Sequence, residues 1–477
     1  MPGLNSSLNI GLSGLQATQG ALNVVGHNIT NISTPNYSRQ VVNLSTAGAI
    51  SFGNQMYGQG VTLTSISGIR NRLLDLQISQ TLSRQTGAQT RDASIEAVST
   101  AFEETDDYGL SALVENFFQG FQDLAANPEN DALRTNLVGQ AQTLVDGLKS
   151  QYRMLAEQRD AANVAVSDQV AEVNTLTEQI ATLNKAVAQE SATGGNSDAR
   201  DQRAALVEKL SKLVGIQAFE DDSGRLQIML DSGTGILVAG DKANRLTATA
   251  DPSLGNYYRV DVVSGSGVAT DVTGSIQEGS LGANLDLRDN IIGGYQSQLD
   301  QLAAGIAGGV NQLHYAGYAL DGVTTSNYFF DGTVANNGLP TGITSANNYL
   351  GMVNALSVNS AIQSDPSLIA AAGVAGQVGD NANAKAMFNL SSGGQFSTAV
   401  SSLVNTIGTD AQRYSTSATN YENLSTALQN QRESVSGVDL DEEATNLMAY
   451  QRGYQACARF INVIDQLTNQ LINNFGV

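Results

Sequence analysis

Four carboxylates near the C-terminal end of the sequence are the strongest candidates for acid–base chemistry. Asp439, Asp441, Glu442 and Glu443 could supply a general acid and a general base if they lined a cleft. They stand directly before a long segment of helical periodicity, and Asp439 with Glu442 has the spacing of a helix capping box. Acidic side chains also stabilise the positive end of a helix. We therefore interpret these carboxylates as helix-capping residues.

The sequence lacks residues suited to metal binding or to nucleophilic catalysis. His27 and His314 are the only histidines, they are far apart, and no HExxH pattern or cysteine cluster accompanies them. Cys457 is the single cysteine, and its position in a helical repeat indicates a small buried side chain. No P-loop, G-x-S-x-G or dinucleotide-binding pattern is present. We predict no catalytic residue, no cofactor and no metal, so the protein is not expected to be an enzyme.

The polar stretch GHNITNISTPNYSRQ near the N-terminus suits recognition better than catalysis. Asn28 and Asn31 either bond to the backbone of a neighbouring subunit or satisfy carbonyl groups at their own helix end. Arg39 either pairs with a carboxylate across an interface or forms an exposed ion pair worth at most about 1 kcal/mol. Asn31 and the Thr34-Pro35 pair end the helix, because the residue before a proline is pushed out of the helical region.

The elements that must position these residues are two heptad repeats, one at each end of the chain. Each repeat has one narrow apolar stripe, so each helix alone is marginal in water and becomes stable when the two stripes bury each other. We predict that the terminal helices pair as a coiled coil. The N-terminal repeat places Leu8, Leu15, Leu22 and Ile29 at one position and Leu4, Val25 and Ile32 at the other, with Gly11 and Thr18 between them as small residues; the C-terminal repeat places Leu447, Tyr454, Ile461 and Thr468 at one and Tyr450, Cys457, Ile464 and Leu471 at the other.

Between the repeats, the periodicity predicts a mainly α fold with a β insert (α+β), drawn out into an elongated multidomain rod. Almost nothing breaks a helix from residue 131 to 190, and a helix of about 60 residues spans about 90 Å. The expected segments are a coiled-coil helix with an extended arm (1–66), a long-helix bundle (67–215), an outer all-β insert (216–287), a helix with loop-rich and β structure packing on the bundle (288–380), the returning helices of the bundle (381–435) and the C-terminal coiled-coil helix (436–477).

Composition excludes several classes of partner. A chain of 477 residues is too long to fold around one ordinary hydrophobic core. Its formal net charge of −21 leaves no basic stripe that could bind nucleic acid. No apolar run reaches about 18 residues, so no membrane span is predicted. The first residues lack the charged and apolar regions of a cleaved signal peptide. An exported chain would have to leave by another route.

Both ends of the chain resemble the paired signatures of the bacterial flagellar rod and hook axial protein family. These are LSGLQATQGALNVVGHNITNISTPNYSRQ near the start and SGVDLDEEATNLMAYQRGYQACARFINVIDQL at the end. The TPNYSRQ run and the long central helix are similar to the hook-associated protein 1 family, the first of the hook-filament junction proteins. Asn36 replaces the family's usual Gly and Cys457 its common Asn, but Asn tolerates a left-handed turn.

The resemblance implies a structural subunit of the flagellar hook-filament junction. Such a subunit is exported by the flagellar type III system without a cleaved signal peptide, becomes extracellular, and takes part in flagellum assembly and motility. The implied partners are other copies of the chain in a helical layer, hook protein, the second hook-filament junction protein and an export chaperone at the C-terminal helix. The alternatives are a hook or distal-rod axial protein and, less favoured, an exported adhesin or enzyme with its activity in the β insert.

The resemblance also makes the two terminal repeats the predicted assembly interface. Its N-terminal residues are Leu8, Leu15, Leu22, Val25, Asn28, Ile29, Asn31, Pro35, Tyr37 and Arg39, and its C-terminal residues are Leu447, Tyr450, Gln451, Tyr454, Gln455, Ile461, Ile464 and Leu471.

Overall fold

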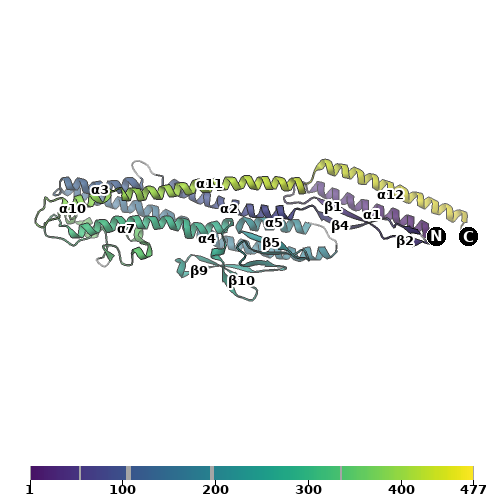
Figure 1. Cartoon of the computed structure of the whole chain (residues 1–477), viewed down its shortest axis with the longest axis horizontal. Helices are drawn as coiled ribbons and strands as arrows, with labels where there is room; N and C mark the ends of the chain where they lie inside the picture. Colours follow the sequence, from purple (N-terminus) through teal and green to yellow (C-terminus); the bar gives the residue numbers. More distant parts are fainter. Residues whose placement is uncertain (1, 53–54, 104–108, 194–197, 334–335, 476–477) are drawn as a thin grey trace. The chain divides into compact units, whose positions relative to one another are not determined.

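The computed structural model describes residues 2–52, 55–103, 109–193, 198–333 and 336–475, and these form two compact units. Unit 1 comprises Met1–Gly87, Asp168–Gly282 and Asn420–Val477, and unit 2 comprises Ala88–Ser167 and Ala283–Thr419. Helices dominate both units, and the small antiparallel sheets of the described residues belong to unit 1 (Figure 1). The predicted mainly α fold with small sheets is therefore confirmed.

Long helices make up most of the chain. The longest, α4 (Asp131–Thr193), has 63 residues and confirms the helix predicted from residue 131. No proline interrupts it, and apolar residues three and four apart, including Val166, Val170 and Val173, are buried along it. The other described helices are α1 (Pro2–Thr30), α2 (Arg72–Ala101), α3 (Leu110–Ala126), α5 (Asp198–Leu213), α6 (Gly279–Asp286), α7 (Ile292–Ala316), α8 (Met352–Ala355), α9 (Ser360–Ser364), α10 (Ala382–Ser392), α11 (Gln395–Ser436) and α12 (Leu440–Phe475).

The strands of unit 1 pair into four small antiparallel sheets. Strands β1 and β4 form one two-stranded ribbon, β2 and β3 form a second, and the insert contains a sheet of order β5-β6-β7-β8 and one of order β9-β10-β11. The strands are β1 (Gln40–Thr46), β2 (Ile50–Phe52), β3 (Gln55–Tyr57), β4 (Val61–Gly68), β5 (Ile216–Glu220), β6 (Leu226–Leu230), β7 (Ile236–Ala239), β8 (Lys242–Ala243), β9 (Arg245–Ala250), β10 (Tyr258–Val263) and β11 (Ala269–Asp271).

The β structure of the insert ends earlier than the sequence pattern indicated. Its last strand stops at Asp271, and the end of the expected segment is the helix α6 followed by a π-helical turn, Leu287–Ile291. Leu281, Ala283 and Leu285 are apolar at every second position, as the residues on one face of a strand are. In the structure all three are buried residues of a helix. A helix that is covered on several sides also shows such alternation, because its apolar residues are not confined to one stripe.

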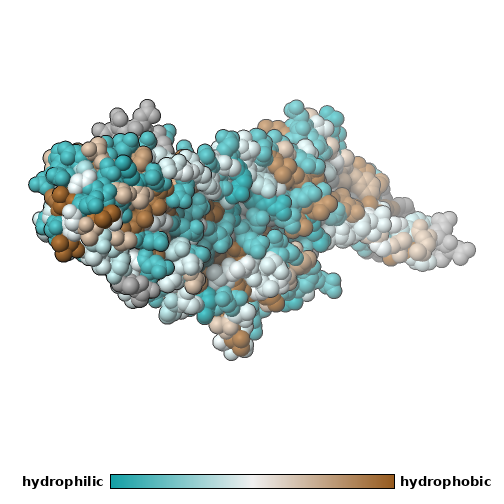
Figure 2. Space-filling model, turned by 60° about the vertical axis from the view of Figure 1, so that its left-hand side comes forward, coloured by the Kyte–Doolittle hydropathy of each residue, from teal (hydrophilic) through white to brown (hydrophobic). Residues whose placement is uncertain are grey.

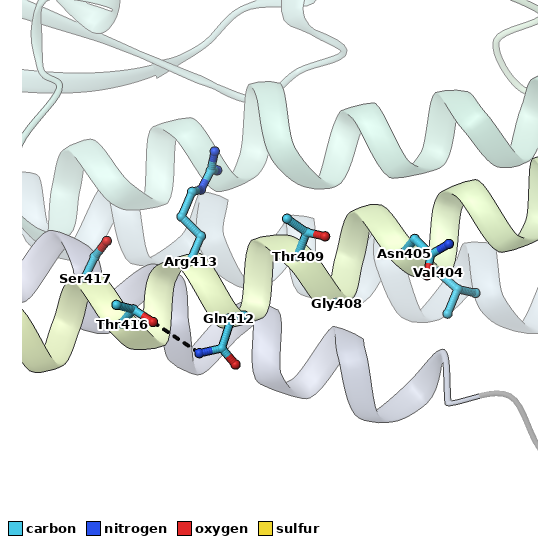
Figure 3. Close-up of a pocket in the computed structure, with 8 residues that line it drawn as sticks. All are labelled: Val404, Asn405, Gly408, Thr409, Gln412, Arg413, Thr416 and Ser417. Atoms are coloured by element: carbon cyan, nitrogen blue, oxygen red, sulfur yellow. Dashed lines mark hydrogen bonds between the residues drawn. The ribbon is translucent and has the colours of Figure 1, made fainter.

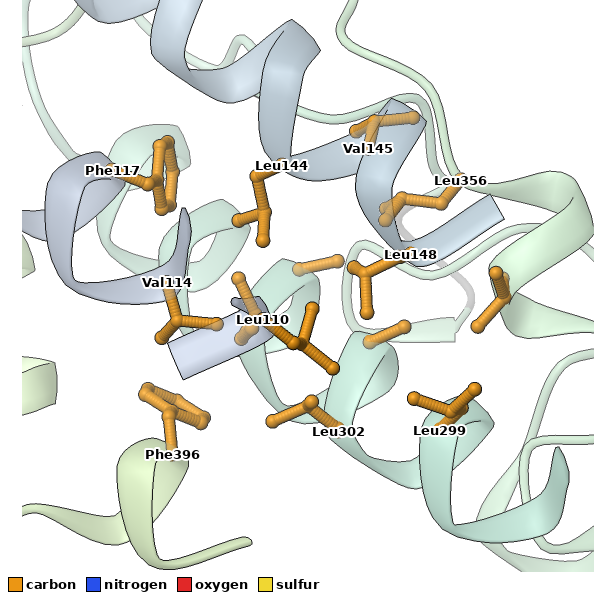
Figure 4. Close-up of a cluster of buried hydrophobic side chains, with 14 of the residues drawn as sticks. Leu110, Val114, Phe117, Leu144, Val145, Leu148, Leu299, Leu302, Leu356 and Phe396 are labelled. Carbon is orange, nitrogen blue, oxygen red and sulfur yellow. The ribbon is translucent and has the colours of Figure 1, made fainter. Parts of the chain in front are cut away.

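The core of unit 2 is centred on the phenylalanines of α3. The ring centroid of Phe117 lies 5.1–5.8 Å from those of Phe118, Phe121, Phe329 and Phe330. Figure 4 shows the apolar side chains of α3 and α4 facing leucines of α7 within the same cluster. These aromatic contacts anchor the loop-rich segment after α7, where the described residues form two isolated bridges, Tyr318–Ala372 and Phe330–Val358, instead of a sheet.

Two buried side chains, Arg134 and His314, form hydrogen bonds with that loop-rich segment. Arg134 of α4 donates to the carbonyl oxygens of Pro128 and Ile369, each at 2.7 Å. His314 of α7 lies 2.9 Å, through Nδ1, from the carbonyl of Asn327, and the amide of Ala370 donates to its Nε2 at 3.0 Å. Because Nε2 accepts a hydrogen bond, the buried imidazole is neutral, with its proton on Nδ1.

Across the described ranges, no helix combines the length and apolar character needed to cross a membrane.

Candidate assembly interface

The terminal helices α1 and α12 pack against each other within unit 1, in antiparallel directions. A Cβ placed on Gly11 would lie 2.8 Å from Cγ1 of Ile461, one on Gly14 would lie 2.8 Å from Sγ of Cys457, and one on Gly453 would lie 3.2 Å from Cγ2 of Thr18. The residue numbers on α1 rise as those on α12 fall. Small residues therefore bring the two backbones close together, and Figure 1 shows the two helices side by side. The supercoil of a true coiled coil stays a prediction.

The predicted stripe on α1 only partly coincides with its buried face. Val25 is buried, but Leu15, Leu22 and Ile29 are half-buried and Leu8 is 41% exposed. The buried positions are small or β-branched residues: Gly11, which the repeat placed in the stripe, and Ala17, Ala21 and Val24, which it did not. A straight helix drifts by about 20° per heptad, so leucines seven residues apart cannot all face one partner unless the pair supercoils.

The predicted stripe on α12 is its least exposed face. Among its predicted residues, six are half-buried: Leu447, Tyr450, Tyr454, Ile461, Ile464 and Leu471. Gln451 and Gln455 are exposed. Other apolar residues of the same helix remain exposed: Met448, Phe460, Val463, Leu467 and Ile472. Phe460 borders the contact with α1, because a Cβ placed on Gly11 would lie 3.1 Å from its Cδ1, and Ile472 lies on the same side of the helix as the stripe. Met448, Val463 and Leu467 form the uncovered apolar surface of α12.

The ribbon of β1 and β4 packs on α1 as well. The side chain of Gln59 donates to Oγ of Ser6 at 3.2 Å, and the amide of Val61 donates to Oγ of Ser13 at 3.2 Å. A Cβ on Gly20 would lie 2.6 Å from Cδ1 of Leu63. The ribbon therefore runs along α1, which lies between it and α12 in contact with both.

Residues 27–40, here called the junction segment, connect the end of α1 to the ribbon. The side chain of Asn28 is buried; its Nδ2 donates to the carbonyl of Gln40 at 2.9 Å, and its Oδ1 accepts from the amide of Gln40 and from the hydroxyl of Tyr37. His27 contacts the same hydroxyl at 3.0 Å. Asn31 donates to the carbonyl of His27, at its own helix end. Both asparagines therefore use partners inside the chain.

Arg39 binds carboxylates at the start of α12, about 400 residues later in the sequence. Its Nε donates to Glu443 at 2.7 Å and its Nη2 to Glu442 at 2.6 Å, while its amide donates to the carbonyl of Ser436. The Glu443 side chain is only 1% exposed. Asp439 caps α12 by accepting from the amides that follow it, but the carboxylate of Glu442 binds Arg39 instead of closing the expected capping box.

The turn at Pro35 has the conformation that the sequence indicated. Helix α1 ends at Thr30, Pro35 is exposed, and Asn36 adopts a left-handed φ of 63°. The Asn36 side chain donates to Oε2 of Glu208 on α5 at 3.2 Å.

Helix α5 supplies partners for the junction segment that the sequence analysis did not identify. Asp201 accepts from the amide of Ser38 at 3.1 Å, and Asp198 accepts from the side chain of Gln40 at 2.7 Å. Both acids lie in the first turn of α5, where a sequence pattern indicates only an interaction with the helix dipole. No spacing in the sequence indicates a contact across about 160 residues.

Burial and negative charge change the acidity of this cluster. Burial raises the pKa of Asp201, although the amide of Ser38 and the guanidinium of Arg70 oppose the change. Burial, with the carboxylates of Asp198 and Asp201, raises the pKa of the Tyr37 hydroxyl well above its ordinary value. Tyr37 is therefore a hydrogen-bond donor at neutral pH, which fits its bond to Asn28.

The described residues of the junction segment are not accompanied by a metal site. The part of the chain that the structure describes holds no group of three or more His, Cys, Asp or Glu residues placed to bind a metal ion. An open groove runs along α11 in unit 2, where Gln412 donates to Thr416 (Figure 3). Its lining comes from one helix and consists mostly of small or amide side chains: Val404, Asn405, Gly408, Thr409, Gln412, Arg413, Thr416 and Ser417.

Comparison with known proteins identifies the group to which this arrangement belongs. The family model described as flagellar hook-associated protein FlgK helical domain matches residues 95–330. The models for the flagella basal body rod protein and for the flagellar basal body rod FlgEFG protein C-terminal match residues 8–37 and 420–474. Flagellar hook-associated protein 1 of Salmonella typhimurium is 27% identical over 555 residues, covering 98% of this chain and 100% of the relative. The chain belongs to the hook-associated protein 1 family.

Other members of the hook-associated protein 1 family match along nearly their whole length. The Escherichia coli protein is 27% identical with 98% of this chain and 100% of the relative covered, and the Bacillus subtilis protein is 26% identical with 97% of each covered. The solved structure of the flagellar hook junction protein FlgK from Burkholderia pseudomallei has a TM-score of 0.67 at 17% identity, covering 76% of this chain and 100% of that chain. The shared fold therefore persists where most residues differ.

The two rod-protein matches coincide with the contacts described above. One includes most of α1 and of the junction segment and ends two residues before Arg39, and the other includes Ser436, Glu442 and Glu443. Arg39 therefore follows directly after one segment matched by a rod-protein model and binds carboxylates in the other.

Proposed function

We propose that the chain is a structural subunit of the bacterial flagellum that forms the junction between hook and filament. The observation that carries this proposal is the match to flagellar hook-associated protein 1 relatives along 97–98% of the chain. The rod-protein models match only the terminal segments, whereas the hook-associated helical domain matches residues 95–330. This favours a junction subunit over a hook or distal-rod protein, and a structural role over an enzyme or adhesin.

The terminal helices are the surfaces through which we expect copies to assemble. Leu8 and Leu12 on α1 are 41% and 45% exposed, and Val463 and Leu467 on α12 are 51% and 45% exposed. Figure 2 shows hydrophobic side chains on the surface of the fainter right-hand part, where Figure 1 places these helices. Burying such side chains against neighbours contributes about 25 cal/mol per Å² of apolar surface, which supports association.

The predicted interface residues divide into two roles under this proposal. Those left exposed, including Leu8, Pro35, Gln451 and Gln455, are available to neighbouring subunits. Those bonded within the chain, Asn28, Asn31, Tyr37 and Arg39, set the position of the helices that carry the exposed residues. The half-buried stripe residues belong to the contact between α1 and α12 and border the uncovered surface.

Export and partner choice follow from the family resemblance. Within the flagellum, we expect other axial proteins as neighbours: hook protein on one side and the second hook-filament junction protein on the other, with further copies in the same helical layer. Such head-to-tail contacts are the kind that propagate along a helical lattice. Before type III export without a cleaved signal peptide, a chaperone is expected to bind the C-terminal helix.

The test compares truncated and full-length chains in a flagellated bacterium that lacks its own copy of the gene. Truncation after Ser436 removes α12, so hooks without filaments are expected, with filament subunit released into the medium. Electron microscopy of the cell surface and assay of the medium give the two readouts. Normal filaments on the truncated chain would contradict the junction role.

A matched pair of point variants separates the uncovered apolar surface from α12 as a whole. Val463→Glu places a charge within that surface, and Asn462→Glu places the same charge at an exposed position on another side of the same helix. We expect Val463→Glu to reduce the number of filaments at least tenfold and Asn462→Glu to leave it within twofold. Equal effects would show that any new charge on α12 disturbs assembly.

A further inference from the structure

Charge is distributed very unevenly along the chain. Arg39 is the only Asp, Glu, Lys or Arg among residues 1–69, and residues 444–477 contain only Arg452, Arg459 and Asp465. The net charge of the whole chain is −21. Residues 1–69 have a net charge of +1, and residues 444–477 also have a net charge of +1. Residues 70–443 therefore have a net charge of −23. The terminal segments are therefore almost neutral, and the rest of the chain is strongly acidic.

The ribbon of β1 and β4 lies entirely within the neutral segment, and each of its strands is an edge strand. Its apolar face includes the directly paired Leu44 and Leu63, and Leu63 lies against Gly20 of α1, while Leu44 stays 47% exposed. The opposite face is polar and uncharged: the amide of Asn43 donates there to Oγ of Ser65 at 3.1 Å and of Ser67 at 2.9 Å.

The ribbon lacks the features that normally keep exposed sheet edges apart. Edge strands are usually protected by charged residues, especially Lys, by proline or by a covering element. Residues 40–69 contain no charged residue and no proline. The β2–β3 end adds exposed apolar side chains, with Ile50 46% and Met56 71% exposed. A two-stranded ribbon is also only marginally stable until a further surface covers it.

We propose that this ribbon is an interface between copies of the chain, and that its open edges and polar face contact the terminal segments of a neighbouring copy. This inference rests on the proposed function, which places several copies in one layer.

The charge distribution indicates which surface of a second copy covers the ribbon. Covering the ribbon with an acidic surface would remove carboxylates from water without giving them a partner, which costs free energy. Residues 70–443 with their charge of −23 are such a surface, whereas residues 1–69 and 444–475 of a second copy are not. Contact with the terminal segments also continues the packing that the ribbon already makes on α1 through Ser13 and Leu63.

The test uses a photo-crosslinking amino acid at Thr62 in the full-length chain, in cells that assemble filaments on it. Thr62 is exposed on the polar face of β4, and the matched control is Thr270, exposed on the edge strand β11 of the acidic insert. We expect a product of twice the chain mass from Thr62, with the crosslink mapped to residues 1–69 or 444–475 of the second copy. Thr270 should give at least tenfold less of it.

A charge at the same two sites gives an independent readout. Thr62→Lys is expected to lower the fraction of hooks with filaments at least tenfold, while Thr62→Ser and Thr270→Lys leave it within twofold. The proposal is overturned if Thr62 crosslinks only to another flagellar protein or to nothing, or if Thr62→Lys assembles normally. Filament formation by the unmodified chain is scored separately, because its failure would count against the junction role itself.

Discussion

Arg39 joins three parts of unit 1 through its side chain and its backbone N–H and C=O groups. Its guanidinium binds Glu442 and Glu443, its amide donates to Ser436, and its carbonyl accepts from Ile69. Burial alone would lower the pKa of Arg39, but the hydrogen bonds that its guanidinium donates to Glu443 and Glu442 raise it. The residue therefore stays charged, and the buried carboxylate of Glu443 depends on it for a counter-charge.

Replacing Arg39 by Ala should destabilise the start of α12 by about 3 kcal/mol, because it leaves the Glu443 carboxylate buried without a partner. Amide exchange in the first turns of α12 should accelerate about 100-fold, since each factor of ten corresponds to about 1.4 kcal/mol. Arg452→Ala, at an exposed position on the same helix, is the control and should change exchange less than threefold. Equal effects of the two variants would contradict the role of the ion pair.

His314 should make the stability of unit 2 depend on pH. Burial lowers the pKa of His314 from its ordinary value of 6.5 to about 4, and the nearby Arg134 adds to the effect. Between pH 6.5 and 4 the unfolded chain binds a proton at this residue and the folded chain does not. The stability is therefore complete above about pH 6.5 and decreases towards pH 4 by about 3 kcal/mol.

The measurement is the midpoint of urea unfolding, followed by circular dichroism, at pH 7, 5.5 and 4.5. Other carboxylates titrate in the same range, so the comparison is with His314→Gln, which cannot take up the proton. The difference between the two chains should shrink as the pH falls. A constant difference across the range would exclude titration of His314 as the cause.

At the scale of elements, glycine allows α1 and α12 to approach closely. Gly14→Ala would push Cβ to 2.8 Å from Sγ of Cys457, and overpacking of this kind costs about 1–3 kcal/mol. Gly26→Ala in the same helix meets nothing within 4 Å and should stabilise it by up to about 1 kcal/mol. We expect amide exchange in α12 to become faster with the first change and no faster with the second.

A second substitution identifies the contact responsible. Cys457→Ala removes the sulfur that a new Cβ at position 14 would meet, so it should restore most of the protection lost in Gly14→Ala. If the double variant exchanges as fast as Gly14→Ala alone, steric contact with Cys457 is not the cause.

Periodicity predicted the long elements well, because their signal is local. Helix α4 follows from the absence of proline and from apolar residues three and four apart, and α12 follows from its heptad. The same reasoning misplaced the end of the β insert, where burial on several sides produced an alternating pattern at Leu281, Ala283 and Leu285. It placed Gly11 and Thr18 in the stripe, and both lie against α12, but it passed over Gly14, because small residues carry little periodic signal.

At the scale of the whole molecule, the candidate site could be predicted only in part. The sequence indicated that the two ends pair and that Arg39 seeks a carboxylate. It could not indicate which carboxylates the junction segment binds, since Glu443, the partner of Arg39, and Asp201, the partner of the Ser38 amide, are each far from that segment in sequence. Contacts over such separations depend on the complete fold, whereas the turn at Asn36 depends only on its neighbours.

We also expect protection in the free chain to decrease from the junction segment towards the two termini. Asn28, Arg39 and Glu443 are buried or paired, while α12 beyond Cys457 is exposed or half-buried throughout its described length. Burial of the uncovered surfaces on assembly would then offset the ordering of the ends. Hydrogen exchange of the monomer tests this gradient, and uniform protection along α12 would contradict it.

The antiparallel contact between α1 and α12 has a consequence for the timing of folding. The two helices come from opposite ends of the sequence, and closing so long a loop is entropically unfavourable and slow. A chain that emerges N-terminus first presents α1 and the ribbon long before α12 exists to cover them. Any product of interrupted synthesis or proteolysis that lacks its last residues leaves α1 without its partner. The topology therefore favours the assembly of chains that contain both terminal helices.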